Sequence, residues 1–301
     1  MASDFTSLMD LAQQIARENQ ASFPAVVKEL LHYEILQTLM ESGSAGNLVF
    51  QGGTALRLCH SGARYSEDLD FAGGLDFDAS VMKPFVERVK KSVGSRYGLS
   101  IEVAERLPNP PDKVPLGRWK AKVRLPLLDR SAQQSYLIQV KVAKIQAYSS
   151  EVMQVRTMSD NVPYAYRAIL LKSESKEEIL ADKIIALGAR PYIKQRDSWD
   201  IHMLAQAGAS LDIELVRWKI KDYFLDRTNF VQSLRSRTKQ LGDQVTIGAF
   251  QKEMSRFLEG PHRAIIQDTF VVHQMLSVVA GVAKAALNEL TPDKPSPPEV
   301  P

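Results

Sequence analysis

Two aspartates, Asp68 and Asp70, stand one residue apart near the end of the segment YSEDLDF (65–71). Polar and apolar residues alternate there, which predicts a strand with both carboxylates and Ser66 on one face. The side chains expected to turn into a core are those of Leu69 and Phe71. Two carboxylates at this spacing repel each other unless a cation lies between them, and Mg2+ prefers such hard oxygen ligands. The pair therefore predicts a magnesium site.

Two adjacent glycines, Gly52 and Gly53, follow a short apolar strand expected at 47–50. Thr54 comes next and suits the N-cap of a helix expected at 55–60. Glycine lets the backbone approach a ligand closely, and the N–H groups at a helix start attract phosphate. A Gly-Gly pair alone is usually a turn, and an Asp-x-Asp alone is usually a solvated strand end. Together, on a strand–turn–helix–strand unit, they indicate phosphoryl or nucleotidyl transfer.

The elements that position these residues belong to a chain of ordinary globular composition. Of its 301 residues, 45% are hydrophobic and 24% are charged, and the net charge of +3 permits a nucleic-acid partner without requiring one. Cys59 is the only cysteine, which excludes a disulfide within the chain and suits a reducing cytoplasm. The N-terminal residues lack the pattern of a signal peptide, and His273, Gln274 and Lys284 interrupt the apolar stretch 270–287. We therefore expect a cytoplasmic protein without a membrane span.

The hydrophobic pattern predicts an α+β fold, with a sheet flanked by helices and a helical region after it. The expected strands are 47–50, 65–71, 99–107, 119–128 and 135–145. The expected helices up to residue 207 are 4–19, 25–41, 55–60, 79–97, 174–189 and 195–207. The later helices are 211–225, 227–241, 246–258 and 262–289. We accordingly expect a core with N-terminal helices at 1–207, a helical domain at 208–290 and a Pro-rich disordered tail at 291–301.

The segment GGTALRL…RYSEDLDF resembles the signature of the DNA polymerase beta-type nucleotidyltransferase superfamily. Within that superfamily, the residues are most similar to the AbiEii family of abortive-infection toxins, which includes the MenT toxins. A second block, EEILADKIIALGARPYIKQRDSWDIHML (177–204), resembles the downstream signature of the same family. The resemblance covers residues 25–207 and implies a mixed β-sheet of the nucleotidyltransferase type.

The resemblance implies a magnesium-dependent nucleotidyltransferase toxin of a toxin–antitoxin or phage-defence system. An NTP is then the substrate, and a cognate antitoxin is the protein partner. Gly52, Gly53 and Thr54 would hold the phosphates, while Asp68 and Asp70 would bind Mg2+.

The second block adds Lys183, on an apolar helix face where a lysine either extends to solvent, pairs with an acid or contacts a ligand. The resemblance favours contact with the triphosphate. It also favours Asp197 as a catalytic residue, although this aspartate could instead cap its helix. Asp200 is either functional or the structural partner of Arg190 or Arg196.

Two residues beside the acid pair also match the family pattern. Arg64 either contacts phosphate or pairs with Glu67. Ser66 would lie near the transferred phosphate, and in some relatives the matching serine is a phosphorylation target that controls activity.

The sequence departs from the superfamily at Lys141, where relatives often carry a third metal-ligating acid. Either two aspartates alone hold the metal, or another acid takes the place of the third ligand. Glu102 and Glu105 are weak candidates for that place. This departure puts a standard two-metal arrangement in doubt.

The expected acceptor is RNA, in particular the tRNA 3′ end that close relatives modify, and two basic stretches could contact it. The first, at 227–242, contains Arg227, Arg235, Arg237 and Lys239. The second, at 117–124, contains Arg118, Lys120, Lys122 and Arg124 around Trp119. A solvated helix and an ordinary amphipathic strand would show the same patterns. Two other functions stay open: transfer to a protein or small molecule, and a catalytically inactive nucleotide-binding partner protein.

Overall fold

A computed structural model describes residues 3–97, 100–109, 112–125 and 134–291. The chain divides into two compact units, with 1–175 and 256–262 in unit 1 and 176–255 and 263–301 in unit 2. The boundary expected after residue 207 therefore falls inside unit 2, because the helices that follow the last strand pack with the C-terminal helices. Residues 292–301 of the expected tail and 126–128 of an expected strand lie outside the described residues.

Unit 1 contains a mixed, seven-stranded sheet of order β3-β4-β5-β2-β1-β7-β6. Its strands are β1 (Val49–Gln51), β2 (Asp68–Ala72), β3 (Ser100–Arg106), β4 (Leu116–Leu125), β5 (Gln134–Ala143), β6 (Ser150–Gln154) and β7 (Leu170–Glu174). Its helices are α1 (Ser3–Glu18), α2 (Phe23–Glu41), α3 (Gly52–Cys59), α4 (Lys83–Tyr97), α5 (Tyr164–Arg167) and the 3-10 helix η1 (Ala79–Met82). The α+β fold with a mixed sheet is confirmed.

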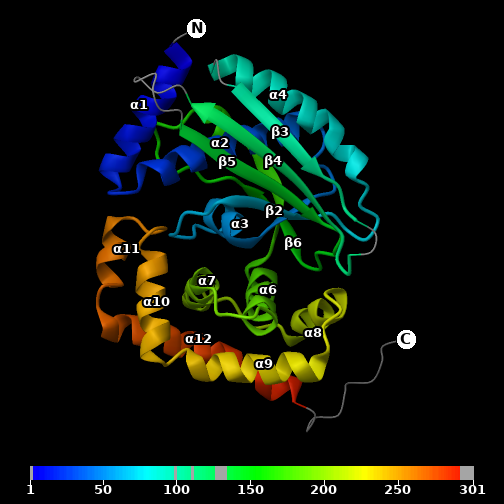
Figure 1. The fold of residues 1–301 in the computed structure, drawn as a ribbon, viewed down its shortest axis with the longest axis vertical. Helices are drawn as coiled ribbons and strands as arrows, with labels where there is room; N and C mark the ends of the chain where they lie inside the picture. Colours follow the sequence, from blue (N-terminus) through cyan, green and yellow to red (C-terminus); the bar gives the residue numbers. More distant parts are fainter. Residues whose placement is uncertain (1–2, 98–99, 110–111, 126–133, 292–301) are drawn as a thin grey trace. The chain divides into compact units, whose positions relative to one another are not determined.

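Helices α2 and α4 form a layer against the sheet, in which α4 runs along β3 and α2 contacts β5 (Figure 1). Helix α3 packs instead against β1, β2 and β7. In the middle of the sheet, β2 pairs antiparallel with β1 and parallel with β5. Strand β2 is therefore contacted by β1 and α3, which precede it in the sequence, and by β5, which follows it.

The second part of the sheet was not expected from the sequence. Strand β6 is an edge strand with four exposed residues in five, and β7 is short and carries the exposed Lys172. Neither sequence, SEVMQ or LLKSE, shows the alternation of apolar and polar residues by which a half-buried strand is predicted. Strand β2 also begins only at Asp68, so Ser66 lies in the loop before it.

Unit 2 is helical. Its helices are α6 (Lys176–Ala189), α7 (Gln195–Gln206), α8 (Ile213–Asp222), α9 (Arg227–Gln240), α10 (Gln244–Met254) and α12 (Thr269–Leu290), and α11 (Gly260–Ile265) begins in unit 1 and ends in unit 2. The helix expected at 262–289 is divided into α11 and α12, because the Asp268 carboxylate caps α12 by accepting from the N–H groups of Phe270 and Val271.

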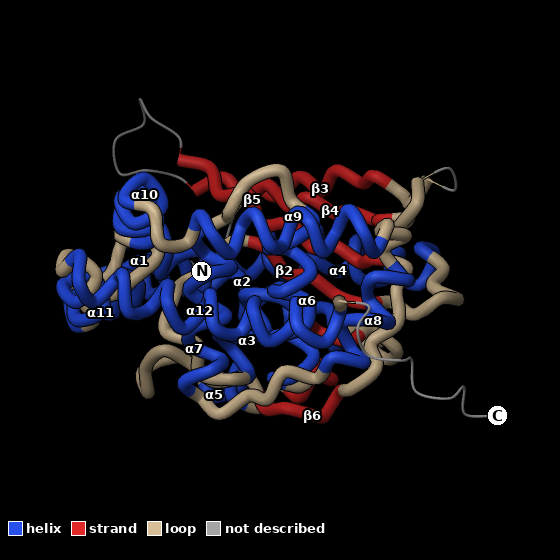
Figure 2. The backbone as a smooth tube through the Cα atoms, turned by 90° about the horizontal axis from the view of Figure 1, so that it is seen from below, coloured by secondary structure: helices blue, strands red, loops and turns tan. Residues whose placement is uncertain are grey.

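Helix α12 is long and apolar enough to cross a membrane by length and composition alone. It packs against α7, α9 and α10, and Figure 2 shows it beside α9. Its exposed positions include His273, Gln274, Ser277, Lys284 and Asn288. A helix with one buried apolar face and one polar face matches the expectation of a packed helix.

Candidate active site

The acid pair lies on β2 in the middle of the sheet. Leu69 and Phe71 are buried, with exposed fractions of 0% and 1%, so the expected alternation is confirmed. Asp68 and Asp70 lie on the opposite face and remain partly exposed, with 28% and 35% of their side-chain area accessible. Two carboxylates that a bound cation or substrate can reach therefore share one face.

The glycine turn lies directly against this pair. Strand β1 ends at Gln51, which pairs with Asp70, and α3 begins at Gly52. Gly52 has a φ of +78°, and a β-carbon placed on it would lie 3.5 Å from Asp70 Oδ2. The backbone therefore needs glycine here, and the start of α3 faces the acid pair. The structure thus places the glycine turn beside the acid pair, as the sequence analysis expected.

Gly53 provides space for an arginine. A β-carbon on Gly53 would lie only 2.2 Å from Arg64 Nη2, so no other residue fits without moving the guanidinium. Arg64 is buried, and its Nη1 donates to the Tyr65 carbonyl at 3.0 Å. A positive charge therefore lies at the N-terminal turn of α3. Glu67 forms an ion pair with Lys28 at 3.4 Å.

Thr54 has a different role from the one expected. The N-cap of α3 is Gln51, and Thr54 is a buried helical residue whose hydroxyl donates to the Asp68 carbonyl. The neighbouring Glu67 carbonyl lies 3.1 Å from His32 Nε2 of α2. Burial lowers the pKa of His32 to about 4, so this imidazole is neutral at pH 7. Thr54 and His32 therefore fix the backbone where the acid pair begins.

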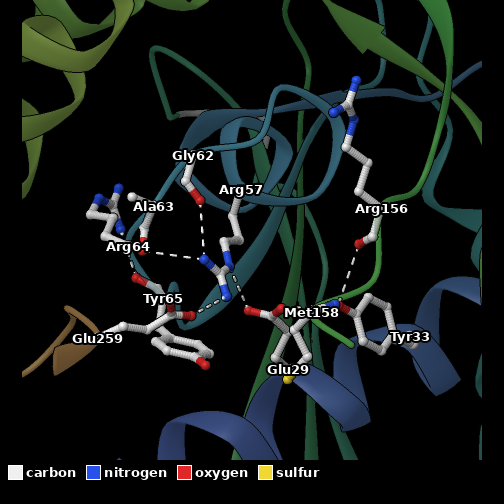
Figure 3. A network of polar contacts seen from close by, with 10 residues as sticks. All are labelled: Glu29, Tyr33, Arg57, Gly62, Ala63, Arg64, Tyr65, Arg156, Met158 and Glu259. Carbon is white, nitrogen blue, oxygen red and sulfur yellow. Dashed lines mark hydrogen bonds and ion pairs between the residues drawn. The ribbon is translucent and has the colours of Figure 1, made fainter. Parts of the chain in front are cut away.

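Arg57 was missed by the sequence analysis, although it stands within the glycine motif. Figure 3 shows its guanidinium at the centre of a polar network. Its Nη1 donates to the carbonyls of Gly62 and Ala63, both at 3.2 Å. Its Nε and Nη2 pair with Glu29 at 3.0 Å and Glu259 at 3.1 Å. Arg57 thereby anchors the loop that leads from α3 to the acid pair.

Lys141 faces the acid pair from β5. Asp70 pairs with Lys141, and Asp68 with Gln139, in the parallel ladder. Lys141 Nζ lies 2.7 Å from Asp68 Oδ2 and 3.4 Å from Asp70 Oδ1, and Gln139 Nε2 donates to Asp68 Oδ1 at 3.3 Å. Partial burial alone lowers the pKa of Lys141, but the Asp70 charge and the Asp68 hydrogen bond raise it overall. The lysine is therefore an ammonium at neutral pH.

The two acids considered as substitutes for the missing ligand do not reach this site. Both lie on the edge strand β3, which β4 and β5 separate from β2. Glu102 pairs with Arg124 at 2.7 Å, and Glu105 accepts from the Trp119 indole at 3.3 Å. Within the described residues, no group of three acidic, histidine or cysteine side chains could hold a metal ion. Two carboxylates with substrate phosphates are nevertheless a ligand set that one Mg2+ accepts.

The second block forms an ion cluster in unit 2. Lys183 Nζ of α6 lies 3.0 Å from Asp197 Oδ1 and 2.8 Å from Asp200 Oδ2, both on α7. Arg190 also pairs with Asp197, and the N-cap position of α7 is Lys194, which makes no side-chain capping hydrogen bond. Asp200 is fully buried, and Lys183 is one of its ion-pair partners. Of the roles considered for Lys183, the structure therefore shows an ion pair with neighbouring acids.

The β4 stretch forms a basic strip on the sheet face that carries the acid pair. Arg118 and Lys120 pair with Lys141 and Gln139, which in turn pair with Asp70 and Asp68. Paired residues project from the same face, so the basic side chains lie about 10 Å from the acid pair, or two strand spacings. The strip continues along alternate positions of β4 and consists of Arg118, Lys120, Lys122 and Arg124.

The other basic stretch lies on α9, in unit 2. Arg235 and Lys239 are exposed and four residues apart, so they share one helix face. Arg237 instead donates to the carbonyl of Pro191 and to the Gln240 side chain. Arg227 likewise donates to the Leu290 carbonyl at 2.8 Å. Only part of this stretch is therefore presented to solvent.

The site combines a glycine turn at the start of a helix with two carboxylates on the neighbouring strand, which is the arrangement of a nucleotidyltransferase-type site. Residues 34–271 match the family described as Nucleotidyl transferase AbiEii toxin, Type IV TA system. The chain therefore belongs to the AbiEii family of nucleotidyltransferase toxins, as its motifs indicated, and an NTP and a cognate antitoxin follow from that membership.

The chain is similar to solved structures, among them two from Helicobacter pylori. JHP933 from Helicobacter pylori is 16% identical, with 90% of this chain and 94% of that chain covered and a TM-score of 0.49. An H. pylori protein provisionally described as a nucleotidyltransferase is also 16% identical, with 87% and 93% covered and a TM-score of 0.44. None of the curated proteins compared with the chain matches it.

Proposed function

We propose that this toxin transfers a nucleotide from an NTP to RNA, in particular to a tRNA 3′ end, with the help of Mg2+. The reaction would take place in the cytoplasm, where NTP and RNA are available. Magnesium, when bound, would neutralise charge on the triphosphate. The acceptor hydroxyl oxygen would form a bond to the α-phosphorus, the bond from that phosphorus to the bridging oxygen would break, and pyrophosphate would leave. The hydroxyl proton would pass to solvent.

The residues of unit 1 would bind and orient the substrate. Asp68 and Asp70 would hold the metal, because they are the accessible carboxylates on the face beside the glycine turn. The first N–H groups of α3, at Gly52 and Gly53, would receive phosphate oxygens. Arg64, which lies against Gly53, would add a positive charge to that cradle.

Three further assignments rest on the family resemblance and stay predictions. Thr54 would act by holding β2, since its hydroxyl already donates to the Asp68 carbonyl. Ser66, two residues before the pair, would lie near the transferred phosphate. Lys183 would contact the triphosphate, with Asp197 as the acid that orients its ammonium.

The basic strip on β4 is the observation that supports an RNA acceptor. A small-molecule acceptor needs no row of positive charge, whereas a nucleic-acid backbone does. The strip lies on the face of the acid pair, so a strand bound along it could place its end at the site of transfer. Lys120 and Lys122 are exposed and free to meet phosphates from solvent, while Arg124 also pairs with Glu102. On α9, Arg235 and Lys239 are exposed basic residues that would contact RNA, and Arg237 would not, since it donates to Pro191 and Gln240.

The acceptor can be identified with labelled nucleotides. Purified protein receives each α-32P-labelled NTP with Mg2+, with or without total RNA, and the products are separated on denaturing gels. Label on RNA, strongest on tRNA, is the expected result. Label on protein or on a small molecule would contradict the RNA assignment. Nucleotide binding without transfer would show an inactive nucleotide-binding protein.

A further inference from the structure

The acid pair already has a cation. Lys141 Nζ contacts one oxygen of each carboxylate, at 2.7 Å from Asp68 and 3.4 Å from Asp70. The side-chain amide of Gln139 occupies the other oxygen of Asp68. The ammonium is held by its own strand, since Lys141 pairs with Asp70 in the β2–β5 ladder. It therefore lies between the carboxylates wherever β5 pairs with β2 in this register.

Two-metal phosphoryl-transfer sites place two divalent ions about 3.5–4 Å apart, where both are bridged by shared carboxylates. Here the carboxylates contribute two negative charges, and the ammonium already offsets one of them. A first divalent ion still finds a favourable site, especially with a triphosphate. A second one would meet Lys141 at close range and would gain no third carboxylate, because the corresponding position on β5 is the lysine itself.

We propose that the Lys141 ammonium takes the place of one of two metal ions, so that the acid pair binds a single divalent cation. The inference rests on the proposed function, since it concerns the same site. Lys141 would supply a fixed positive charge near the reacting phosphate without depending on metal concentration. A fixed charge needs no reorganisation when negative charge develops in the transition state.

The inference can be tested by counting bound ions. The full chain is titrated with Mn2+ alone, and free Mn2+ is followed by its electron paramagnetic resonance signal. Lys141→Asp restores a third acid and should bind one more ion per chain than the wild type does. Lys141→Met removes the charge but keeps most of the side-chain volume, and it should bind its ion about tenfold more tightly or better, since a repelling charge is lost.

Lys172→Met is the control, because Lys172 is an exposed lysine on β7 of the same sheet. It should bind Mn2+ as the wild type does. Thermal unfolding shows that each variant is folded, and Lys141→Gln replaces Lys141→Met if the latter is not. Equal ion numbers in wild type and Lys141→Asp, or unchanged affinity in the neutral variant, would overturn the inference.

The outcome is separate from that of the transfer assay. If the wild type transfers nucleotide but Lys141→Asp gains no ion, the inference about Lys141 fails and the proposed function stands. If the extra ion appears but no acceptor is labelled, the proposed function fails and the cation assignment stands.

Discussion

Replacing Lys183 by alanine should destabilise the protein by about 3–5 kcal/mol. A lysine that extends from an apolar helix face to solvent could be removed at little cost. In the structure, however, the Lys183 ammonium lies within 3.0 Å of Asp197 and 2.8 Å of Asp200, and Asp200 has no exposed surface. Its removal leaves two buried carboxylates facing each other with less compensating charge. For a protein of this size the loss corresponds to a fall in Tm of about 10 °C.

The assay is urea unfolding followed by far-UV circular dichroism and by tryptophan fluorescence, to which Trp199, buried on α7, contributes. Lys183→Met combined with Asp200→Asn should recover most of the lost stability, because the charge is then removed from both partners. Lys252→Ala, at an exposed position on α10, is the control and should stay within about 0.5 kcal/mol of the wild type.

The same variants separate structure from chemistry. If Lys183 also contacts the triphosphate, the double variant should be stable and yet fail to use NTP. Recovery of both stability and transfer would make Lys183 a purely structural residue. A loss below about 1 kcal/mol for Lys183→Ala would refute the electrostatic reasoning, because an exposed ion pair contributes no more than that to stability.

Three further predictions concern unit 1. Replacing Lys120 and Lys122 by Gln should reduce the slope of log affinity against log salt for single-stranded RNA by about 1.4, and superimposable slopes would exclude the strip as the contact. Burial lowers the pKa of His32 from 6.5 to about 4, so the unfolded chain binds a proton first as the pH falls. Stability should therefore be lost between about pH 6.5 and 4, by up to about 3 kcal/mol, and urea midpoints of His32→Gln should show a weaker pH dependence over that window. Gly53→Ala would place its β-carbon 2.2 Å from Arg64 Nη2, so nucleotide affinity should fall, and unchanged affinity would remove Arg64 from the phosphate cradle.

The candidate site shows which features follow from local sequence. Alternation in the segment 65–71 placed Leu69 and Phe71 in the core and both aspartates on the other face, because strand geometry decides this without knowledge of neighbours. The turn at Gly52 and Gly53 could likewise be predicted from adjacent residues alone. Thr54 was expected to cap α3, but its hydroxyl donates to the Asp68 carbonyl of β2, a contact between elements that the local sequence does not reveal.

The remaining features depend on register and on tertiary contacts. Lys141 was noted as a departure from the family pattern, but its contact with the acid pair requires the pairing of β5 with β2. Arg57 shows no signal in the sequence, since its partners are distant carboxylates and loop carbonyls. The partners of Lys183 depend on how α6 packs against α7.

The central claim is that Asp68 and Asp70 hold the metal for nucleotidyl transfer, and one measurement tests it most directly. Transfer of label from α-32P NTP to RNA is compared among the wild type, Asp68→Asn, Asp70→Asn and the exposed-residue control Asp76→Asn, all shown to be folded. The account predicts that each of the first two variants loses about 100-fold or more of the activity, that the control keeps it, and that chelation of divalent ions abolishes it in the wild type. Near wild-type transfer by folded Asp68→Asn or Asp70→Asn in the presence of Mg2+ would contradict the claim.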